Sequence, residues 1–142
     1  MSDDLKKGLE GVLVAESGLS MIDGDVGKLV YRGYTIEDLA NGASYEEVLY
    51  LLWHGHLPDE DELADFEAAM VDERTIDDGL LETVRELAEA NEEPMAALRT
   101  AVSMLSAYDP APADAEPTDE TVNLAKGRRI TAKIPTILAA FS

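Results

Sequence analysis

The chain has 142 residues, of which 46% are hydrophobic, and it carries 30 acidic against 11 basic residues, a formal net charge of −19. The negative charge excludes ordinary binding to nucleic-acid phosphates, the lack of cysteine excludes disulfides and thiolate zinc sites, and no apolar run is long enough to span a membrane. Because the apolar fraction is that of a globular protein, we expect a packed core rather than disorder.

The negative charge is concentrated in the middle of the chain. Of the 30 acids, 15 lie between Asp59 and Glu93, where only Arg74 and Arg85 oppose them. Such a surface repels itself in dilute buffer, whereas molar salt shortens the Debye length to about 3 Å and screens the repulsion. The composition therefore predicts a halophilic protein, with an ordinary acidic mesophilic protein as the alternative. Because the acidic start, residues 1–4, does not resemble a signal peptide, we expect a cytoplasmic location.

Two short, mostly apolar runs flank a turn sequence near the start of the chain. The runs are Ser20–Ile22 and Leu29–Tyr31, and the segment between them contains Asp23-Gly24. This dipeptide favours a tight turn because glycine adopts positive φ without steric cost. The pattern predicts a β-hairpin over residues 20–31, which Arg32-Gly33-Tyr34 ends.

Helical patterns follow the hairpin. Thr35 is a candidate cap for a short turn that Asn41-Gly42 terminates. Ser44 and Glu47 have the spacing of a capping box, which predicts a helix over residues 44–54 that Gly55 and Pro58 stop. Asp59 and Glu62 repeat that spacing and predict a helix over residues 60–73.

Three more helices complete the predicted fold. Apolar spacing predicts helices over residues 78–90, 94–107 and 118–142, with Pro94 in a first turn, Thr118 as a cap and Pro135 as a kink. A proline- and acid-rich loop, Asp109–Pro117, separates the last two. The fold class is therefore mainly α, multihelical with a small β-hairpin near the N-terminus. We expect the first four of these helices to bury the following apolar residues: Tyr45, Val48, Leu49, Leu51 and Leu52; Leu63, Phe66, Ala69 and Met70; Leu80, Leu81, Val84 and Leu87; Met95, Leu98, Val102 and Leu105. The apolar residues of the last helix are Val122, Leu124, Ile130, Ile134, Ile137, Leu138 and Phe141.

Two short motifs resemble metal sites. His54 and His56 lie two residues apart and would face one ion if the segment were extended, but they follow a predicted helix end, where imidazole interacts favourably with the carbonyl dipole. Asp23-x-Asp25-x-Gly27 resembles the start of a calcium loop. The glycine and glutamate that such a loop needs are replaced by Lys28 and Tyr34. We therefore favour a helix end and a hairpin turn over metal binding.

One basic cluster is a candidate anion site. Lys126, Arg128, Arg129 and Lys133 lie close together in the last predicted helix. They would suit an anion such as a CoA phosphate, or they would offset the acidic region or a neighbouring subunit, and we favour the second interpretation. We assign no catalytic, cofactor-binding or metal-binding residue to this chain.

The order of several motifs resembles the amino-terminal part of the citrate synthase family, particularly its archaeal and bacterial dimeric type. The match covers essentially the whole chain but only about the first third of a full-length enzyme. At the position where relatives often carry a histidine before the Pro-Met pair, this chain has Glu93, a position that is not catalytic in the family. The motifs are Leu9-Glu10-Gly11-Val12, Glu16-Ser17, Ile22-Asp23-Gly24, Leu29-Val30-Tyr31-Arg32-Gly33-Tyr34, Ile36-Glu37-Asp38-Leu39-Ala40, Glu46-Glu47-Val48, Leu51-Leu52-Trp53, Gly55-x-Leu57-Pro58, Pro94-Met95-x-x-Leu98-Arg99-Thr100 and Ala132-Lys133-Ile134-Pro135-Thr136-Ile137.

The resemblance implies a mostly helical homodimer that condenses acetyl-CoA with oxaloacetate to citrate and CoA in the tricarboxylic acid cycle, without a metal or cofactor. It implies an aspartate base and two histidines, in motifs like Leu-His-Gly-Gly-Ala-Asn and Gly-His-Arg-Val-Tyr that this chain lacks. Neither His54 nor His56 matches them. Residues 1–142 are thus expected to form the N-terminal part of the large domain, with the rest of that domain and the small domain absent.

Several expectations follow for the chain by itself. Its apolar helical end, Phe141-Ser142, has no capping signal, which indicates a truncated chain or gene fragment. We expect no activity from it, weak stability, and an exposed apolar stripe over residues 130–141. The alternatives are a 2-methylcitrate synthase that uses propionyl-CoA, and a non-catalytic helical fragment or gene remnant.

Overall fold

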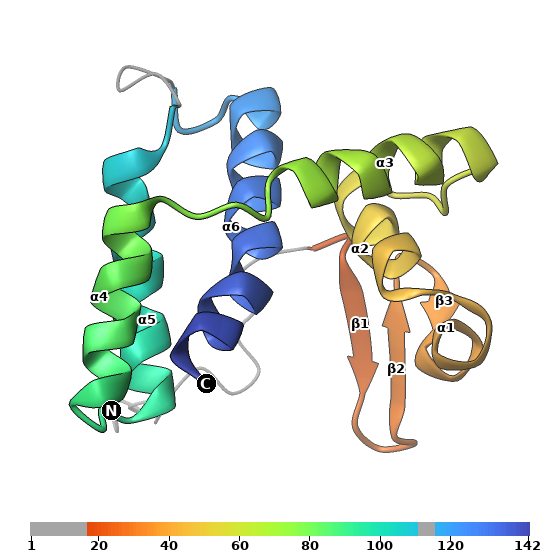
Figure 1. Cartoon of the computed structure of the whole chain (residues 1–142). Coiled ribbons are helices and arrows are strands. Elements are labelled where there is room, and N and C mark those ends of the chain that lie inside the picture. Colours follow the sequence, from red (N-terminus) through yellow and green to blue (C-terminus); the bar gives the residue numbers. More distant parts are fainter. Residues whose placement is uncertain (1–16, 111–115) are drawn as a thin grey trace, which may run out of the picture. The chain divides into compact units, whose positions relative to one another are not determined.

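The computed structural model describes residues 17–110 and 116–142, and these residues fall into two compact units that divide between Pro58 and Asp59. The described part is mostly helical, with six α-helices and one small sheet, which confirms the predicted fold class (Figure 1). The Leu9–Val12 motif and most of the Asp109–Pro117 loop lie outside the described residues. No helix within the described ranges is both long and apolar enough to cross a bilayer.

The first unit begins with the predicted hairpin. Strand β1 (Ser20–Asp23) pairs antiparallel with β2 (Lys28–Tyr31), and Met21 lies opposite Val30. The Asp23 carboxylate accepts hydrogen bonds from the backbone nitrogens of Asp25 (3.1 Å) and Val26 (3.4 Å), so this side chain organises the turn. The structure therefore confirms the turn interpretation of the Asp23-x-Asp25-x-Gly27 motif.

The sequence predicted that Arg32-Gly33-Tyr34 ends the hairpin, but the sheet continues beyond this turn. Arg32 and Gly33 have φ values of 47° and 96° and form a second tight turn. Positive φ at both central residues is the conformation that suits the right-handed twist of the flanking strands. A third strand, β3 (Tyr34–Thr35), therefore pairs with β2 and gives the sheet order β1-β2-β3.

Helix α1 (Ile36–Gly42) follows the sheet directly. The Thr35 hydroxyl accepts a hydrogen bond from the backbone nitrogen of Asp38 (3.2 Å), which confirms the predicted N-cap. The helix ends at Gly42, as predicted, but the glycine is not a left-handed cap, because Gly42 is helical and the C-cap is Ala43, in an extended conformation. The helix thus ends without a left-handed residue.

Helix α2 (Tyr45–His54) has the predicted capping box. The backbone nitrogen of Ser44 donates to the Glu47 carboxylate (2.6 Å), and the Ser44 hydroxyl accepts from the nitrogen of Glu47 (3.1 Å). Gly55, at φ 87°, ends the helix. Tyr45 was wrongly assigned to the core, since 64% of it is exposed. The buried residues of α2 are Leu51, as expected, and Tyr50, which was not expected.

The second unit contains the four longer helices α3 (Glu60–Asp72), α4 (Asp78–Glu89), α5 (Pro94–Met104) and α6 (Glu120–Phe141). Helix α5 ends earlier than the predicted range of residues 94–107, because its last turn tightens into a 3₁₀ helix, η1 (Leu105–Tyr108). Thr118 does not cap α6, because the Asp119 carboxylate accepts from the nitrogen of Val122 (3.1 Å). The ribbon of α6 is continuous through Pro135, and its last turns incline away from the earlier ones (Figure 1).

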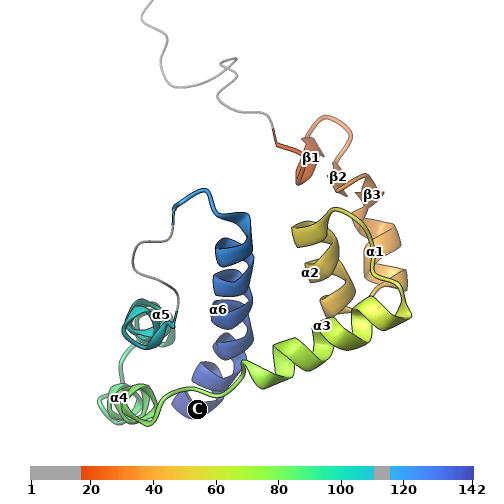
Figure 2. The same cartoon turned by 90° about the horizontal axis from the view of Figure 1, so that it is seen from above.

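The core of the second unit lies among α4, α5 and α6. The view in Figure 2 looks nearly down the axes of α4 and α5. Helix α5 contributes the small residues Ala97 and Ala101, whereas Met95, which was expected inside, is 66% exposed. The expected apolar stripe over residues 130–141 is exposed only in part, because Ile137 is fully enclosed while Leu138 is 41% exposed. The core residues are Ile76, Leu80, Val84, Ala101, Leu105 and Ile137.

Candidate functional site

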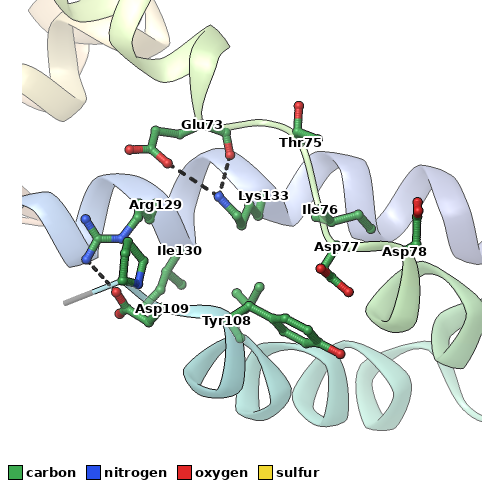
Figure 3. Close-up of a pocket in the computed structure, with 12 residues that line it drawn as sticks. Glu73, Thr75, Ile76, Asp77, Asp78, Tyr108, Asp109, Arg129, Ile130 and Lys133 are labelled. Atoms are coloured by element: carbon green, nitrogen blue, oxygen red, sulfur yellow. Dashed lines mark hydrogen bonds and ion pairs between the residues drawn. The ribbon is translucent and has the colours of Figure 1, made fainter. Parts of the chain in front are cut away.

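The second unit contains a cavity of about 520 Å³ between the start of α4, the 3₁₀ turn η1 and one face of α6 (Figure 3). Its walls combine apolar side chains with six charged ones. The lining residues are Glu73, Thr75, Ile76, Asp77, Asp78, Leu105, Tyr108, Asp109, Pro110, Arg129, Ile130 and Lys133. A cavity of this size and mixed character is the default place to look for a ligand.

The guanidinium on the α6 wall is already paired. Nη2 of Arg129 lies 2.6 Å from Oδ1 of Asp109, and both side chains are largely buried, at 16% and 17% exposure. In Figure 3 the guanidinium points toward this carboxylate, at one end of the cavity. A charge-assisted hydrogen bond this short neutralises the cation where an incoming anion would have to bind.

The ammonium one turn further along α6 is paired as well. Nζ of Lys133 donates to the backbone carbonyl of Glu73 (2.7 Å) and lies 3.5 Å from the Glu73 carboxylate, which Arg128 also approaches at 3.7 Å. Two of the four residues of the basic cluster therefore meet Glu73 and a third, Arg129, meets Asp109. This arrangement confirms that the cluster offsets nearby acids, and it gives no support to the CoA-phosphate alternative.

The opposite wall is built at the start of α4. Oδ1 of Asp77 accepts from the backbone nitrogen of Gly79 (2.9 Å), so this carboxylate caps the helix. A Cβ on Gly79 would lie 2.9 Å from the Tyr108 hydroxyl, so the missing side chain leaves room for the tyrosine ring beside α4. The Asp77 carboxylate on this wall is therefore engaged at the start of α4.

The two histidines occupy a different place, in the first unit. Their rings pack on one aromatic ring, with centroid distances from Tyr50 of 4.1 Å for His54 and 5.5 Å for His56. Within the described ranges, no three histidine, aspartate or glutamate residues are grouped so that they could hold a metal ion. Both histidine rings therefore pack against Tyr50 at the end of α2.

Sequence reasoning missed the role of Arg32. Its guanidinium donates to the backbone carbonyl of Leu52, at 3.0 Å from Nη2 and 3.4 Å from Nε. Leu52 belongs to the last turn of α2, where carbonyls have no partner within the helix. The signal was the Tyr-Arg-Gly-Tyr run itself, because arginine is an unusual residue in a turn that requires positive φ.

The sequence is similar to those of characterised enzymes. Residues 8–142 match the protein family described as citrate synthase, C-terminal domain. Citrate synthase of Haloferax volcanii is 62% identical over 142 residues, which are 100% of this chain and 38% of that protein. Citrate synthase 2 of Bacillus subtilis is 40% identical over 136 residues (96% and 35%), and 2-methylcitrate synthase of Mycobacterium tuberculosis is 41% identical over 136 residues (96% and 33%).

Solved structures give the same result. Citrate synthase of Pyrobaculum aerophilum superposes with a TM-score of 0.81 at 37% identity, over 94% of this chain and 34% of that one. Citrate synthase of Thermoplasma acidophilum, in a ternary complex with carboxymethyl coenzyme A and oxaloacetate, superposes with a TM-score of 0.71 at 29% identity, over 94% and 36%. The chain thus spans about a third of the length of the proteins it matches.

Proposed function

Because the chain belongs to the citrate synthase family, we propose that it forms part of a citrate synthase, a transferase that condenses acetyl-CoA with oxaloacetate to give citrate and CoA. The observation that carries this proposal is the 62% identity with the Haloferax volcanii enzyme across the whole chain. The ternary complex of the Thermoplasma acidophilum enzyme with carboxymethyl coenzyme A and oxaloacetate supports the same substrate pair. Acetyl-CoA is here a substrate and no cofactor is involved.

We further propose that these 142 residues are the N-terminal part of the large domain and are inactive by themselves. Condensation needs a base to remove a methyl proton and donors to polarise the oxaloacetate carbonyl. The sequence contains neither family histidine motif, and the rings of His54 and His56 pack on Tyr50. A role in the tricarboxylic acid cycle, a homodimer, a cytoplasmic location and a halophilic source complete the proposal.

A 2-methylcitrate synthase is the second candidate. The enzyme of Mycobacterium tuberculosis with that name is 41% identical over 136 residues, about as similar as citrate synthase 2 of Bacillus subtilis. The two activities differ in one methylene of the acyl group, and a pocket distinguishes a methylene by only about 10–200-fold. The acyl preference therefore has to be measured.

The test is a comparison of kcat/KM for acetyl-CoA and propionyl-CoA, with oxaloacetate, for the complete gene product that contains this segment, assayed by release of free CoA thiol in molar salt. We expect a higher kcat/KM for acetyl-CoA. A higher value for propionyl-CoA would assign the second activity, and no turnover of either thioester would leave a non-catalytic member of the family. The 142-residue chain, assayed beside it, is expected to match the blank.

A further inference from the structure

We propose that the Asn41–Gly42 bond at the end of α1 is a site of spontaneous deamidation, and that the last turn of this helix controls its rate. The sequence has three asparagines, and only Asn41 is followed by glycine. Because glycine has no Cβ, nothing on that residue shields its backbone nitrogen from the neighbouring side chain. Asn91 and Asn123 are followed by Glu92 and Leu124, whose side chains obstruct the same approach.

The reaction needs water and no other reagent. The backbone nitrogen of Gly42 attacks Cγ of the Asn41 amide and loses its proton as the new C–N bond forms. The bond from Cγ to Nδ2 breaks, and ammonia leaves. Water then opens the resulting five-membered imide at either carbonyl, which gives an aspartate or, with the backbone routed through the side chain, an isoaspartate.

The fold leaves this bond accessible but restrained. Asn41 and Gly42 are both exposed, and, apart from the adjacent residues and the backbone of α1 itself, no atom lies within 4 Å of the position of a Cβ on Gly42. Nδ2 of Asn41 donates to the backbone carbonyl of Glu37 (2.9 Å), and both residues are helical. The amide is thereby held in a hydrogen bond, and the attack requires the last turn to open.

That opening is easy for a helix of this kind. Helix α1 has seven residues and buries only Leu39, so little packing opposes fraying of its end. The other two asparagines also donate to carbonyls, Asn91 to Glu89 (3.3 Å) and Asn123 to Pro117 (2.9 Å). They therefore serve as internal controls that share the hydrogen bond and differ in the following residue.

Deamidation would alter the connection between α1 and α2. A carboxylate at position 41 cannot donate to Glu37, and it places negative charge at the end of α1 where the helix dipole is negative. An isoaspartate also adds one carbon to the main chain. Ser44, which begins the capping box of α2, lies only three residues further on.

The experiment follows deamidation of all three asparagines in the full chain during incubation in mildly alkaline buffer, with molar salt or with concentrated urea, by peptide mass spectrometry and isoaspartate detection. We expect Asn41 to react faster than Asn91 and Asn123 in both solutions, molar salt and concentrated urea. We expect it to react about fivefold more slowly in salt than in urea, the factor that corresponds to one net hydrogen bond.

Gly42→Ala is the matched control, because the site has room for a methyl group and Gly42 is not left-handed. This variant should slow the reaction of Asn41 even in urea, where no helix remains. Equal rates at the three asparagines in urea would overturn the site, and equal rates for Asn41 in salt and urea would overturn control by α1.

Discussion

Arg32 combines an unfavourable backbone with a favourable contact. A non-glycine residue at φ 47° is disfavoured, yet its guanidinium supplies a donor to the Leu52 carbonyl at the end of α2. Hydrogen bonds from charged groups contribute about 1.5–3 kcal/mol, more than the strain of about 1–2 kcal/mol for one left-handed residue. The side chain therefore explains why arginine is compatible with this turn.

Two substitutions separate these effects. Arg32→Ala loses the hydrogen bonds and keeps the strain, so we expect it to lower the free energy of unfolding by about 2 kcal/mol. Arg32→Gly loses the same bonds but adopts positive φ freely, so it should be about 1 kcal/mol more stable than Arg32→Ala. Denaturant midpoints in molar salt measure both. An Arg32→Ala variant as stable as the parent would show that the contact with Leu52 contributes nothing.

At the scale of elements, the end of α3 is capped by side chains of α6. The backbone carbonyl of Glu73 accepts from Lys133 (2.7 Å), and that of Arg74 accepts from the Thr136 hydroxyl (2.8 Å). These carbonyls follow the last turn of α3, which has no glycine cap of its own. The Ala132–Ile137 motif thus has a physical role, since two of its polar residues fix the α3–α4 connection.

Lys133→Met should lower the free energy of unfolding by about 2 kcal/mol, because it removes a charged donor from the Glu73 carbonyl in a part-buried hydrogen bond and leaves Glu73 with one ion pair fewer. Lys126, on the same helix, has no hydrogen bond or ion pair in the described structure. The free energy of unfolding of Lys126→Met should therefore stay within about 0.5 kcal/mol of the parent's. Chemical unfolding monitored by circular dichroism compares the two variants. Equal effects would contradict a specific role for Lys133.

Features set by residues close together in the sequence could be predicted, whereas contacts between distant segments could not. The boxes at Ser44 and Asp59 were predictable because both partners lie within one helical turn. Tyr45 and Met95 were placed inside wrongly, because an apolar residue on a helix is buried only if another element covers its face. In the candidate site, the basic cluster was correctly expected to meet acids, but Lys133 and Glu73 are 60 residues apart and their pairing requires the fold.

For the whole molecule, the net charge of −19 opposes folding through self-repulsion, which added salt can screen. On α4, Glu82 and Glu86 lie one turn apart in a groove bordered by four acids and Arg85. Like charges at this spacing destabilise a helix by about 0.2–0.5 kcal/mol per pair. The sum of many such terms predicts that the melting temperature and helix content of the chain rise from dilute buffer to molar potassium chloride.

Glu86→Lys tests the electrostatic origin of this rise, because it replaces a repulsion with Glu82 by an attraction of favourable polarity. We expect the variant to be about 0.5–1 kcal/mol more stable than the parent at low salt and indistinguishable from it at molar salt, where the Debye length is about 3 Å. Thermal melts at both salt concentrations provide the measurement. A stabilisation that persists in molar salt would indicate packing rather than charge.

The two alanines of α5 have a consequence for how this fold can vary. Ala97 and Ala101 are almost completely enclosed, and Ala101 shares its cluster with Leu80 and Ile137. Since a packed interior has no spare volume, a larger residue at position 101 would be accommodated only alongside a smaller one opposite it. Among aligned homologues, the sizes of these three positions should therefore covary inversely, each enlargement accompanied by a reduction across the helix contact.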